Sequence, residues 1–241
     1  MRELSVMRVI DRAQARIVGG FGSDSRTNRR LAKLTQAGLL RRFYLGRNGV
    51  GAQALHSLTR LGARTVDVDY RSPRRIRDEV LLGDFFVHHQ LAINAVHLQF
   101  KYRPLPDGVT FKRWLAFRQP LSQAIALIPD GYVELFTCKE LKGWFLEVDL
   151  GNERLRIWNK KAEQYLRLAI TKDFNRLFHL ERFRVLVMAN SERRMLSLRT
   201  AVAEVTSKLF WFATTHEVER DGIFGARWLR PTGEDREVLL S

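Results

Sequence analysis

The sequence predicts an α/β protein in which a small basic unit of helices and a β-hairpin precedes a larger unit built on a mixed β-sheet. Helical periodicity dominates the first forty residues, and a glycine-rich turn then separates two short apolar runs. After residue 108, strand-like runs alternate with helical ones, which favours a sheet containing parallel pairs. We therefore expect units at 1–68 and 79–241, joined by a polar linker at 69–78.

Three helices are expected in the first unit. Apolar residues from Leu4 to Ile10 predict the first helix, and Asp11 can cap a second helix that runs from Arg12 to about Val18. A third helix is expected from Arg26 to Ala37, because serines precede it and Gly38 follows it.

A β-hairpin is expected after these helices. Residues 39–45 and 52–58 are its two strand candidates, and residues 46–51 form a turn rich in glycine and asparagine. A fourth helix is expected from Thr59 to Thr65. Three helices followed by a hairpin is the order of a winged helix-turn-helix, in which the third helix lies in the major groove of DNA.

The charge of the first unit indicates a polyanionic partner. Residues 1–70 contain 13 Lys and Arg against 5 Asp and Glu, and the whole chain has a net charge of +15. Nucleic acid is the usual partner of such a surface, and double-stranded DNA suits a winged helix. The alternative is a winged helix that contacts another protein. The residues expected to contact DNA are Arg26, Thr27, Arg29, Arg30, Lys33, Arg41, Arg42 and Arg47.

The second unit is expected to begin with a helix from Glu79 to about Phe100, whose apolar residues are spread widely enough to indicate burial on more than one side. Strands and helices then alternate. Strands are expected at 109–117, 124–136, 144–150, 184–189, 208–214 and 226–229, with helices at 152–170 and 192–207.

Three acidic residues are expected to meet at one end of this sheet. Glu147 and Asp149 share one face of their strand, and the neighbouring strand can bring Asp130 to the same place. On the following helix, Lys161 borders the apolar stripe and can face the sheet, whereas Lys160 points nearly opposite. Acids beside a lysine can hold Mg²⁺ or Mn²⁺ next to a phosphate. All three acids are therefore candidate metal ligands and catalytic residues, together with Lys161.

His89, on the long helix, is a further catalytic candidate as a contact to phosphate or to metal-bound water. Its alternative role is that of a buried, hydrogen-bonded histidine. The acids have an alternative as well, because Glu147 and Asp149 can form structural ion pairs with Arg154, Arg156 or Lys161.

The whole chain resembles the replication-relaxation family of plasmids and integrative elements. The segments that carry the resemblance are Leu58–Ala63, His89–Asn94, Pro129–Asp130, Phe145–Glu153, Lys161 with Tyr165, and Arg193–Arg194. The resemblance implies a winged helix followed by an α/β domain similar to PD-(D/E)XK nucleases. That superfamily normally has a lysine where Asp149 stands, and Lys161 on the next helix can replace it.

The resemblance implies a DNA-binding protein of a mobile genetic element. One interpretation is a Mg²⁺-dependent DNA endonuclease or nickase that acts in replication, transfer or processing of the element. Another is a non-catalytic regulator of transcription or replication, with an inactive nuclease-like domain that forms a homodimer. A nuclease that acts on RNA is a third.

The remaining sequence features indicate a cytoplasmic, DNA-associated protein. Cys138 is the only cysteine, so no intramolecular disulfide can form. No apolar run is long enough to cross a bilayer, and no signal peptide is recognisable, so no membrane partner is expected.

Overall fold

The computed structural model describes residues 1–45, 53–70 and 84–240. The chain divides into two compact units, Met1–Leu98 and Gln99–Ser241, and the division falls within helix α5 (Asp84–Tyr102). The predicted hairpin turn at 46–51, with Arg47, lies outside the described residues, as does most of the predicted linker at 69–78. The prediction of a mixed α/β protein with a large mixed sheet is confirmed.

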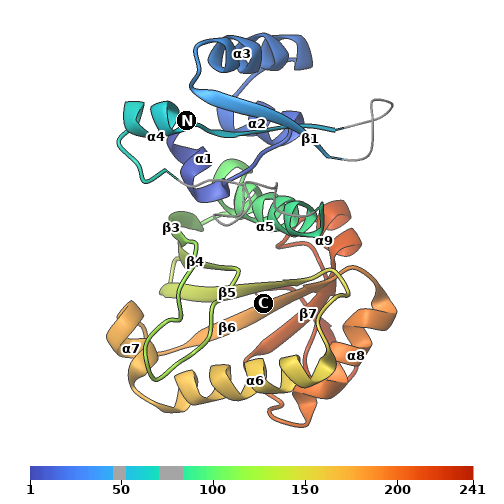
Figure 1. Cartoon of the computed structure of the whole chain (residues 1–241). Coiled ribbons are helices and arrows are strands. Elements are labelled where there is room, and N and C mark those ends of the chain that lie inside the picture. Colours follow the sequence, from blue (N-terminus) through green and yellow to red (C-terminus); the bar gives the residue numbers. More distant parts are fainter. Residues whose placement is uncertain (46–52, 71–83, 241) are drawn as a thin grey trace. The chain divides into compact units, whose positions relative to one another are not determined.

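Unit 1 has the predicted order of helices and strands (Figure 1). Its elements are α1 (Arg2–Met7), α2 (Arg12–Gly19), α3 (Asp24–Gln36), β1 (Leu40–Leu45), β2 (Gln53–Leu58), α4 (Arg60–Thr65) and the first part of α5. The polar residues before the helices act as caps. Asp11 accepts a hydrogen bond from Gln14 N at 2.8 Å, and Ser23 accepts one from Arg26 N at 3.3 Å.

The hairpin of unit 1 is tightly joined to α4. Strands β1 and β2 pair antiparallel, with Leu40 opposite Leu58. Thr59 then caps α4 by accepting a hydrogen bond from Gly62 N at 2.9 Å, while its own hydroxyl donates to Gly38 O at 2.6 Å. A Cβ on Gly62 would lie 2.0 Å from Leu39 O, so only glycine fits at this position.

Buried polar contacts hold the first part of α5 to α1 and α2 within unit 1. Asn94 is 1% exposed, and its Nδ2 donates to Met7 O at 3.2 Å and to Val9 O at 2.7 Å. Gln14 Nε2 donates to Leu91 O at 2.9 Å. These bonds give acceptors to the buried side-chain amides of Asn94 and Gln14, which would otherwise be costly to bury.

Unit 2 contains a seven-stranded sheet in the order β3-β4-β5-β6-β7-β8-β9. Strands β5, β6 and β7 run parallel, and the remaining neighbours pair antiparallel. The strands are β3 (Thr110–Leu115), β4 (Gly131–Phe136), β5 (Leu141–Asp149), β6 (Phe183–Ala189), β7 (Phe210–Thr214), β8 (Trp228–Leu229) and β9 (Arg236–Glu237).

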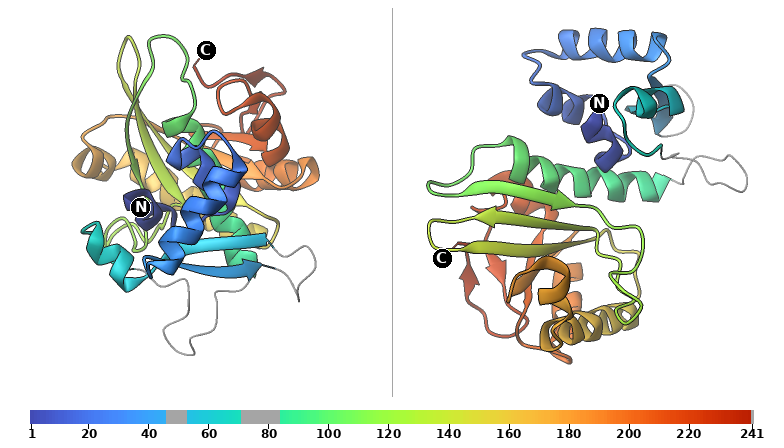
Figure 2. Two further views of the ribbon diagram at one scale, coloured as in Figure 1. Left: turned by 90° about the horizontal axis from the view of Figure 1, so that it is seen from above. Right: turned by 90° about the vertical axis from the view of Figure 1, so that its left-hand side faces the viewer.

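Helices α6 (Leu155–Ile170) and α8 (Glu192–Ala203) pack against each other and against one face of this sheet (Figure 1, Figure 2). Their apolar stripes meet aromatic side chains of the sheet, such as Phe145 and Phe210, in one large buried cluster. Burial of this apolar surface is the dominant favourable contribution to the stability of the unit. Both helices therefore present side chains to the sheet in a fixed orientation.

Three short elements of unit 2 were not predicted, and one predicted strand is wrong at its start. The missed elements are α7 (Asp173–Phe178), α9 (Thr215–Asp221) and β9. Residues 124–130 are irregular rather than strand, because local bonds such as Leu121 N to Leu127 O turn the chain there. Asp130 consequently lies immediately before β4 rather than within it.

Candidate functional site

The predicted acids lie at the carboxyl end of β5 and at the neighbouring start of β4. In the antiparallel register, Gly131 stands opposite Leu146, which brings Asp130 next to Glu147. Val148 N donates to Asp130 Oδ2 at 2.8 Å, so the loop before β4 is tied to β5 at this point. The carboxyl end of a parallel strand is where open α/β sheets usually bind ligands.

Glu147 is completely buried, and both of its carboxylate oxygens accept hydrogen bonds from α6. Lys161 Nζ lies 2.9 Å from Oε2, and Tyr165 OH donates to Oε1 at 2.6 Å. Burial raises the pKa of Glu147 to about 7, although Lys161 opposes this shift, and Asp130 adds to it. The carboxylate is therefore held by a cation and a hydroxyl rather than open to solvent.

Lys161 faces the sheet, as predicted, and Lys160 is exposed. Besides Glu147, Lys161 pairs with Glu153 Oε2 at 2.9 Å, and its ammonium lies 4.9 Å from the centre of the Trp158 ring. Burial alone would lower the pKa of Lys161, but Glu147, Glu153 and Asp130 raise it above its ordinary value. Lys161 is thus a charged residue at neutral pH.

Asp149 is 2% exposed and accepts four hydrogen bonds. Arg194 binds it with two donors, Nε to Oδ1 and Nη2 to Oδ2, each at 2.8 Å. Trp158 Nε1 donates to Oδ2 at 2.8 Å, and Gly151 N donates to Oδ1 at 2.7 Å. Burial would raise the pKa of Asp149, but the hydrogen bonds from Arg194, Trp158 and Gly151 lower it. Gly151 has a φ of 93°, a conformation that favours glycine in the Glu-X-Asp-X-Gly element.

Donors of the protein itself contact the carboxylate oxygens of Glu147 and Asp149 that would bind a metal ion. Four donors occupy the oxygens of Asp149, and two donors occupy those of Glu147. Among the described residues, no group of three or more His, Cys, Asp or Glu side chains is placed to hold a metal. The expectation of Mg²⁺ or Mn²⁺ at Asp130, Glu147 and Asp149 stays a prediction.

The predicted DNA-contacting residues lie on α3 and β1 of unit 1, apart from Arg47. Arg26, Arg29, Arg30 and Lys33 are exposed, as is Arg42, whereas Arg41 is half-buried. Thr27 corrects the prediction: it is 0% exposed, and its hydroxyl donates to Ser23 O at 2.9 Å, so it cannot reach DNA.

Two basic residues of α2 are already paired. Arg12 and Arg16 contact Asp24 at 3.2 and 3.3 Å. The four cations of α3, in contrast, form no ion pair with any carboxylate that the structure describes. We call Arg26, Arg29, Arg30 and Lys33 the α3 cations.

Comparison with known proteins gives one match. The model of the replication-relaxation family matches residues 2–179, which is more than half of the chain. The protein belongs to the replication-relaxation family. It therefore has a role in the replication or relaxation of plasmids or other mobile elements. No curated protein and no solved structure matches the chain.

The family match covers unit 1 and the first part of unit 2. It includes all three acids and Lys161, but it ends before Arg194, the cation that binds Asp149. His89 of this replication-relaxation protein lies on α5 in unit 1, half-buried, with its ring 6.2 Å from that of Phe85.

Sequence reasoning placed Lys161 beside the acids but missed the contacts of two further residues of α6, Trp158 and Tyr165. Trp158, Lys161 and Tyr165 lie on one face of α6 and all contact Glu147 or Asp149. The spacing of these residues could have indicated the tryptophan and the tyrosine. The expected alternative partners Arg154 and Arg156 are exposed instead. None of the described helices is both long and apolar enough to span a membrane.

Proposed function

We propose that this protein is a DNA-binding factor of a mobile genetic element and that α3 is its recognition helix. The observation that carries the proposal is the set of α3 cations, which are exposed and have no carboxylate partner among the described residues. Exposed like charges on one helix repel each other, and a polyanion relieves that repulsion. The phosphate backbone of DNA supplies such a polyanion.

The order of elements in unit 1 supports this assignment. A third helix that follows a capped turn and precedes a two-stranded hairpin has the order of a winged helix-turn-helix. In that arrangement α3 enters the major groove, and the exposed Arg42 of β1 contacts the backbone nearby. Arginine suits both contacts, because its planar guanidinium binds phosphate and guanine with two donors.

We further propose that the acids of unit 2 stabilise the fold and do not cut DNA. Glu147 and Asp149 are buried, and all their described partners are donors from the protein itself. A catalytic carboxylate needs access to its substrate or to water. Here Lys161, Tyr165 and Arg194 occupy the positions that such a ligand would take. The acid network then anchors α6 and α8 to β5.

The proposal is tested by fluorescence anisotropy with a labelled DNA duplex. One variant replaces the four α3 cations by glutamine, and a control removes the same charge from α6 and its N-cap residue. Its substitutions are Arg154→Gln, Arg156→Gln, Lys160→Gln and Arg167→Gln, all at exposed positions. We expect the α3 variant to bind about a thousandfold more weakly at roughly 0.1 M salt. The control should lose far less affinity, and an equal loss would show that only net charge matters.

A second candidate, metal-dependent cleavage of DNA, is favoured by one observation. Asp130 lies close enough to Glu147 and Lys161 to influence the pKa of both, so the three residues converge. Cleavage is tested with Mg²⁺ or Mn²⁺ on supercoiled, linear, single-stranded and branched DNA. Cutting that disappears in Asp130→Ala and in Lys161→Ala would establish this candidate. Binding without cutting on every substrate would support the structural role.

A further inference from the structure

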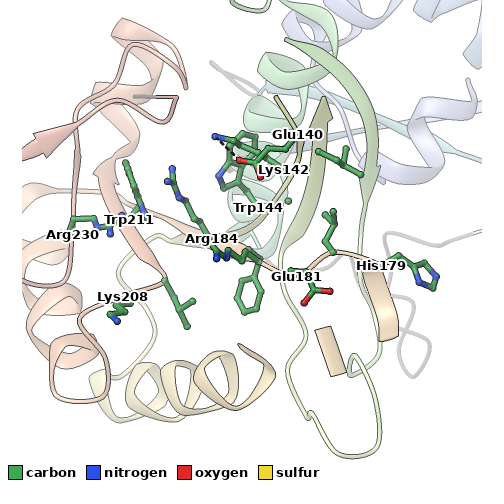
Figure 3. A pocket seen from close by; sticks show the side chains of 15 residues that line it. Glu140, Lys142, Trp144, His179, Glu181, Arg184, Lys208, Trp211 and Arg230 are labelled. Carbon is green, nitrogen blue, oxygen red and sulfur yellow. Dashed lines mark ion pairs between the residues drawn. The ribbon is translucent and has the colours of Figure 1, made fainter. Parts of the chain in front are cut away.

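A second candidate site lies in unit 2, at the opposite end of the parallel strands from the acids. It is a pocket of about 970 Å³, lined by the starts of β5, β6 and β7 and by the segments that lead into them (Figure 3). The lining includes 140–144, 179–184, Lys208, Leu209 and Trp211, together with Arg230. A pocket of this size can take a nucleotide or several linked phosphates rather than a single small ion.

Basic side chains outnumber acidic ones around the pocket. The lining contains five Lys and Arg residues and two Glu residues. These are Lys142, Arg182, Arg184, Lys208 and Arg230, with Glu140 and Glu181. Only Lys142 among these cations has a described carboxylate partner, Glu140, at 3.6 Å. The excess of positive charge favours an anionic ligand.

Two arginines are held together on one tryptophan. The guanidinium carbons of Arg184 and Arg230 lie 4.4 and 4.6 Å from the centre of the Trp211 ring (Figure 3). Arg184 also donates to Leu239 O at 3.1 Å, which leaves further donors on the same guanidinium. Stacking on the ring limits the motion of both guanidiniums and so prepares them to bind a planar or tetrahedral anion.

The negative charge near Arg184 does not balance the effect of its burial and of Arg230. Burial and the neighbouring Arg230 lower the pKa of Arg184, and the smaller opposite effects of Glu237 and Glu140 do not cancel this shift. Trp211 is 1% exposed, and its buried Nε1 has no hydrogen-bond acceptor in the part of the chain that the structure describes. Within the described residues, the indole therefore contacts the two arginines through its ring and forms no hydrogen bond of its own.

We propose that this pocket is a phosphate-binding site, held by Arg184 and Arg230 on Trp211 and extended by Lys208. Trp144 and Trp211 are each 1% exposed, so their rings are not available to stack on a base. Recognition therefore acts through phosphate groups. A free nucleotide or the backbone of a DNA strand can supply them. The proposal does not depend on DNA binding by α3.

Isothermal titration calorimetry on the full chain tests the site with three probes: tripolyphosphate, ATP and a short single-stranded oligonucleotide. The variants are Arg184→Gln, Arg230→Gln and Lys208→Gln. Arg227→Gln removes the same charge from an exposed position outside the pocket. Because Arg184 is half-buried, thermal melting first establishes that each variant is folded. Lys208 is exposed, so its replacement keeps the test valid if Arg184→Gln does not fold.

We expect saturable binding of at least one probe with a stoichiometry of one. Its affinity should fall about tenfold or more in Arg184→Gln and Arg230→Gln, less in Lys208→Gln, and not in Arg227→Gln. Binding of tripolyphosphate and ATP would identify a free phosphate compound as the ligand, whereas binding of the oligonucleotide alone would identify a DNA strand. Absence of binding by all three probes, or an equal loss in Arg227→Gln, would overturn the proposal.

Discussion

The α3 cations of unit 1 are exposed, whereas Glu147 and Asp149 of unit 2 are buried; we call these two acids and their hydrogen-bond donors the acid network. The α3 cations are exposed and have no described carboxylate partner, although Arg12 and Arg16 on the neighbouring helix are paired. Glu147 and Asp149 are buried, and every oxygen of their carboxylates accepts a hydrogen bond. The α3 cations are therefore available to a ligand. The carboxylates of Glu147 and Asp149 instead hold α6 and α8 to β5.

Because of this difference, substitutions in the two regions should change different properties of the protein. Replacing an exposed cation removes an attraction for DNA and changes the free energy of unfolding little, since surface charges contribute little to stability. Replacing a buried acid removes the acceptor from several donors in a largely buried site, which is costly for the free energy of unfolding. The α3 surface should therefore be sensitive in binding, and the acid network sensitive in stability.

The largest effect on stability is expected for Asp149→Ala. The substitution leaves Arg194 without its carboxylate and Trp158 Nε1 without an acceptor, so the free energy of unfolding should fall by about 3–5 kcal/mol. Urea denaturation measures it, with Asp107→Ala at an exposed position of unit 2 as a control. If Asp149→Ala has the same free energy of unfolding as the wild type but abolishes DNA binding or cleavage, Asp149 has a direct role in function. The proposed structural role of the buried acids would then be wrong.

The pH dependence of stability sharpens the contrast. The pKa of Glu147 is about 7 in the folded protein, against 4.5 for the ordinary side chain, so the folded state binds the proton more tightly than the unfolded state. Protonation of Glu147 should therefore stabilise the folded state at low pH, and this stabilisation should be lost as the pH rises from about 4.5 to 7. The upper bound of this effect is about 3 kcal/mol.

Urea denaturation of the wild type and of Glu147→Gln at pH 5 and pH 7 measures the contribution of Glu147 titration to the free energy of unfolding. The variant cannot titrate at this position, so the difference in unfolding free energy between the two proteins should change over this range. A constant difference would mean that Glu147 is ionised throughout and that Lys161 and Tyr165 compensate fully for its burial.

The two adjacent lysines of α6 give a matched comparison. Lys161→Met removes the cation from Glu147 and Glu153 and should cost about 2 kcal/mol of stability. Lys160→Met changes an exposed residue and should cost no more than about 0.5 kcal/mol. Thermal or urea unfolding of both variants measures the difference. Equal effects would show that the contact with Glu147 is energetically unimportant.

The smallest effect is expected for Arg42 on β1. It is exposed, and its guanidinium lies 5.6 Å from the centre of the Tyr44 ring. Arg42→Gln should reduce the affinity for duplex DNA about tenfold at roughly 0.1 M salt, as expected for the loss of one phosphate contact. Anisotropy with the same labelled duplex measures it. Unchanged affinity would place the hairpin outside the DNA interface.

Much of the fold could be predicted because the decisive signals are local. The start of α3 is fixed by Ser23 and its end is followed by Gly38, and both are visible in the sequence. The short elements α7 and β9 have too few residues for a periodic pattern. Helix α9 could have been found, because Thr214 and Glu217 form a capping box.

The partners of the acids were harder to predict. The inward orientation of Lys161 follows from helical geometry, but Arg194 reaches Asp149 only because β6 pairs parallel to β5 and carries α8 to the same end of the sheet. Tyr165 lies on the buried face of α6 together with Trp158 and Ala162. It is indeed completely buried, but its hydroxyl binds Glu147. Sequence spacing indicates which acids lie close together, but it does not show which side chains donate hydrogen bonds to them.

The central claim is tested most directly by the salt dependence of DNA binding. The measurement is the slope of log affinity against log salt for a duplex, in EDTA, for wild type and for the variant with all four α3 cations replaced by glutamine. Contacts from these residues to about four phosphates predict that the slope becomes shallower by about 3 to 4 in the variant. The same slope in both proteins would contradict the account, because the α3 cations would then make no contact with the DNA backbone.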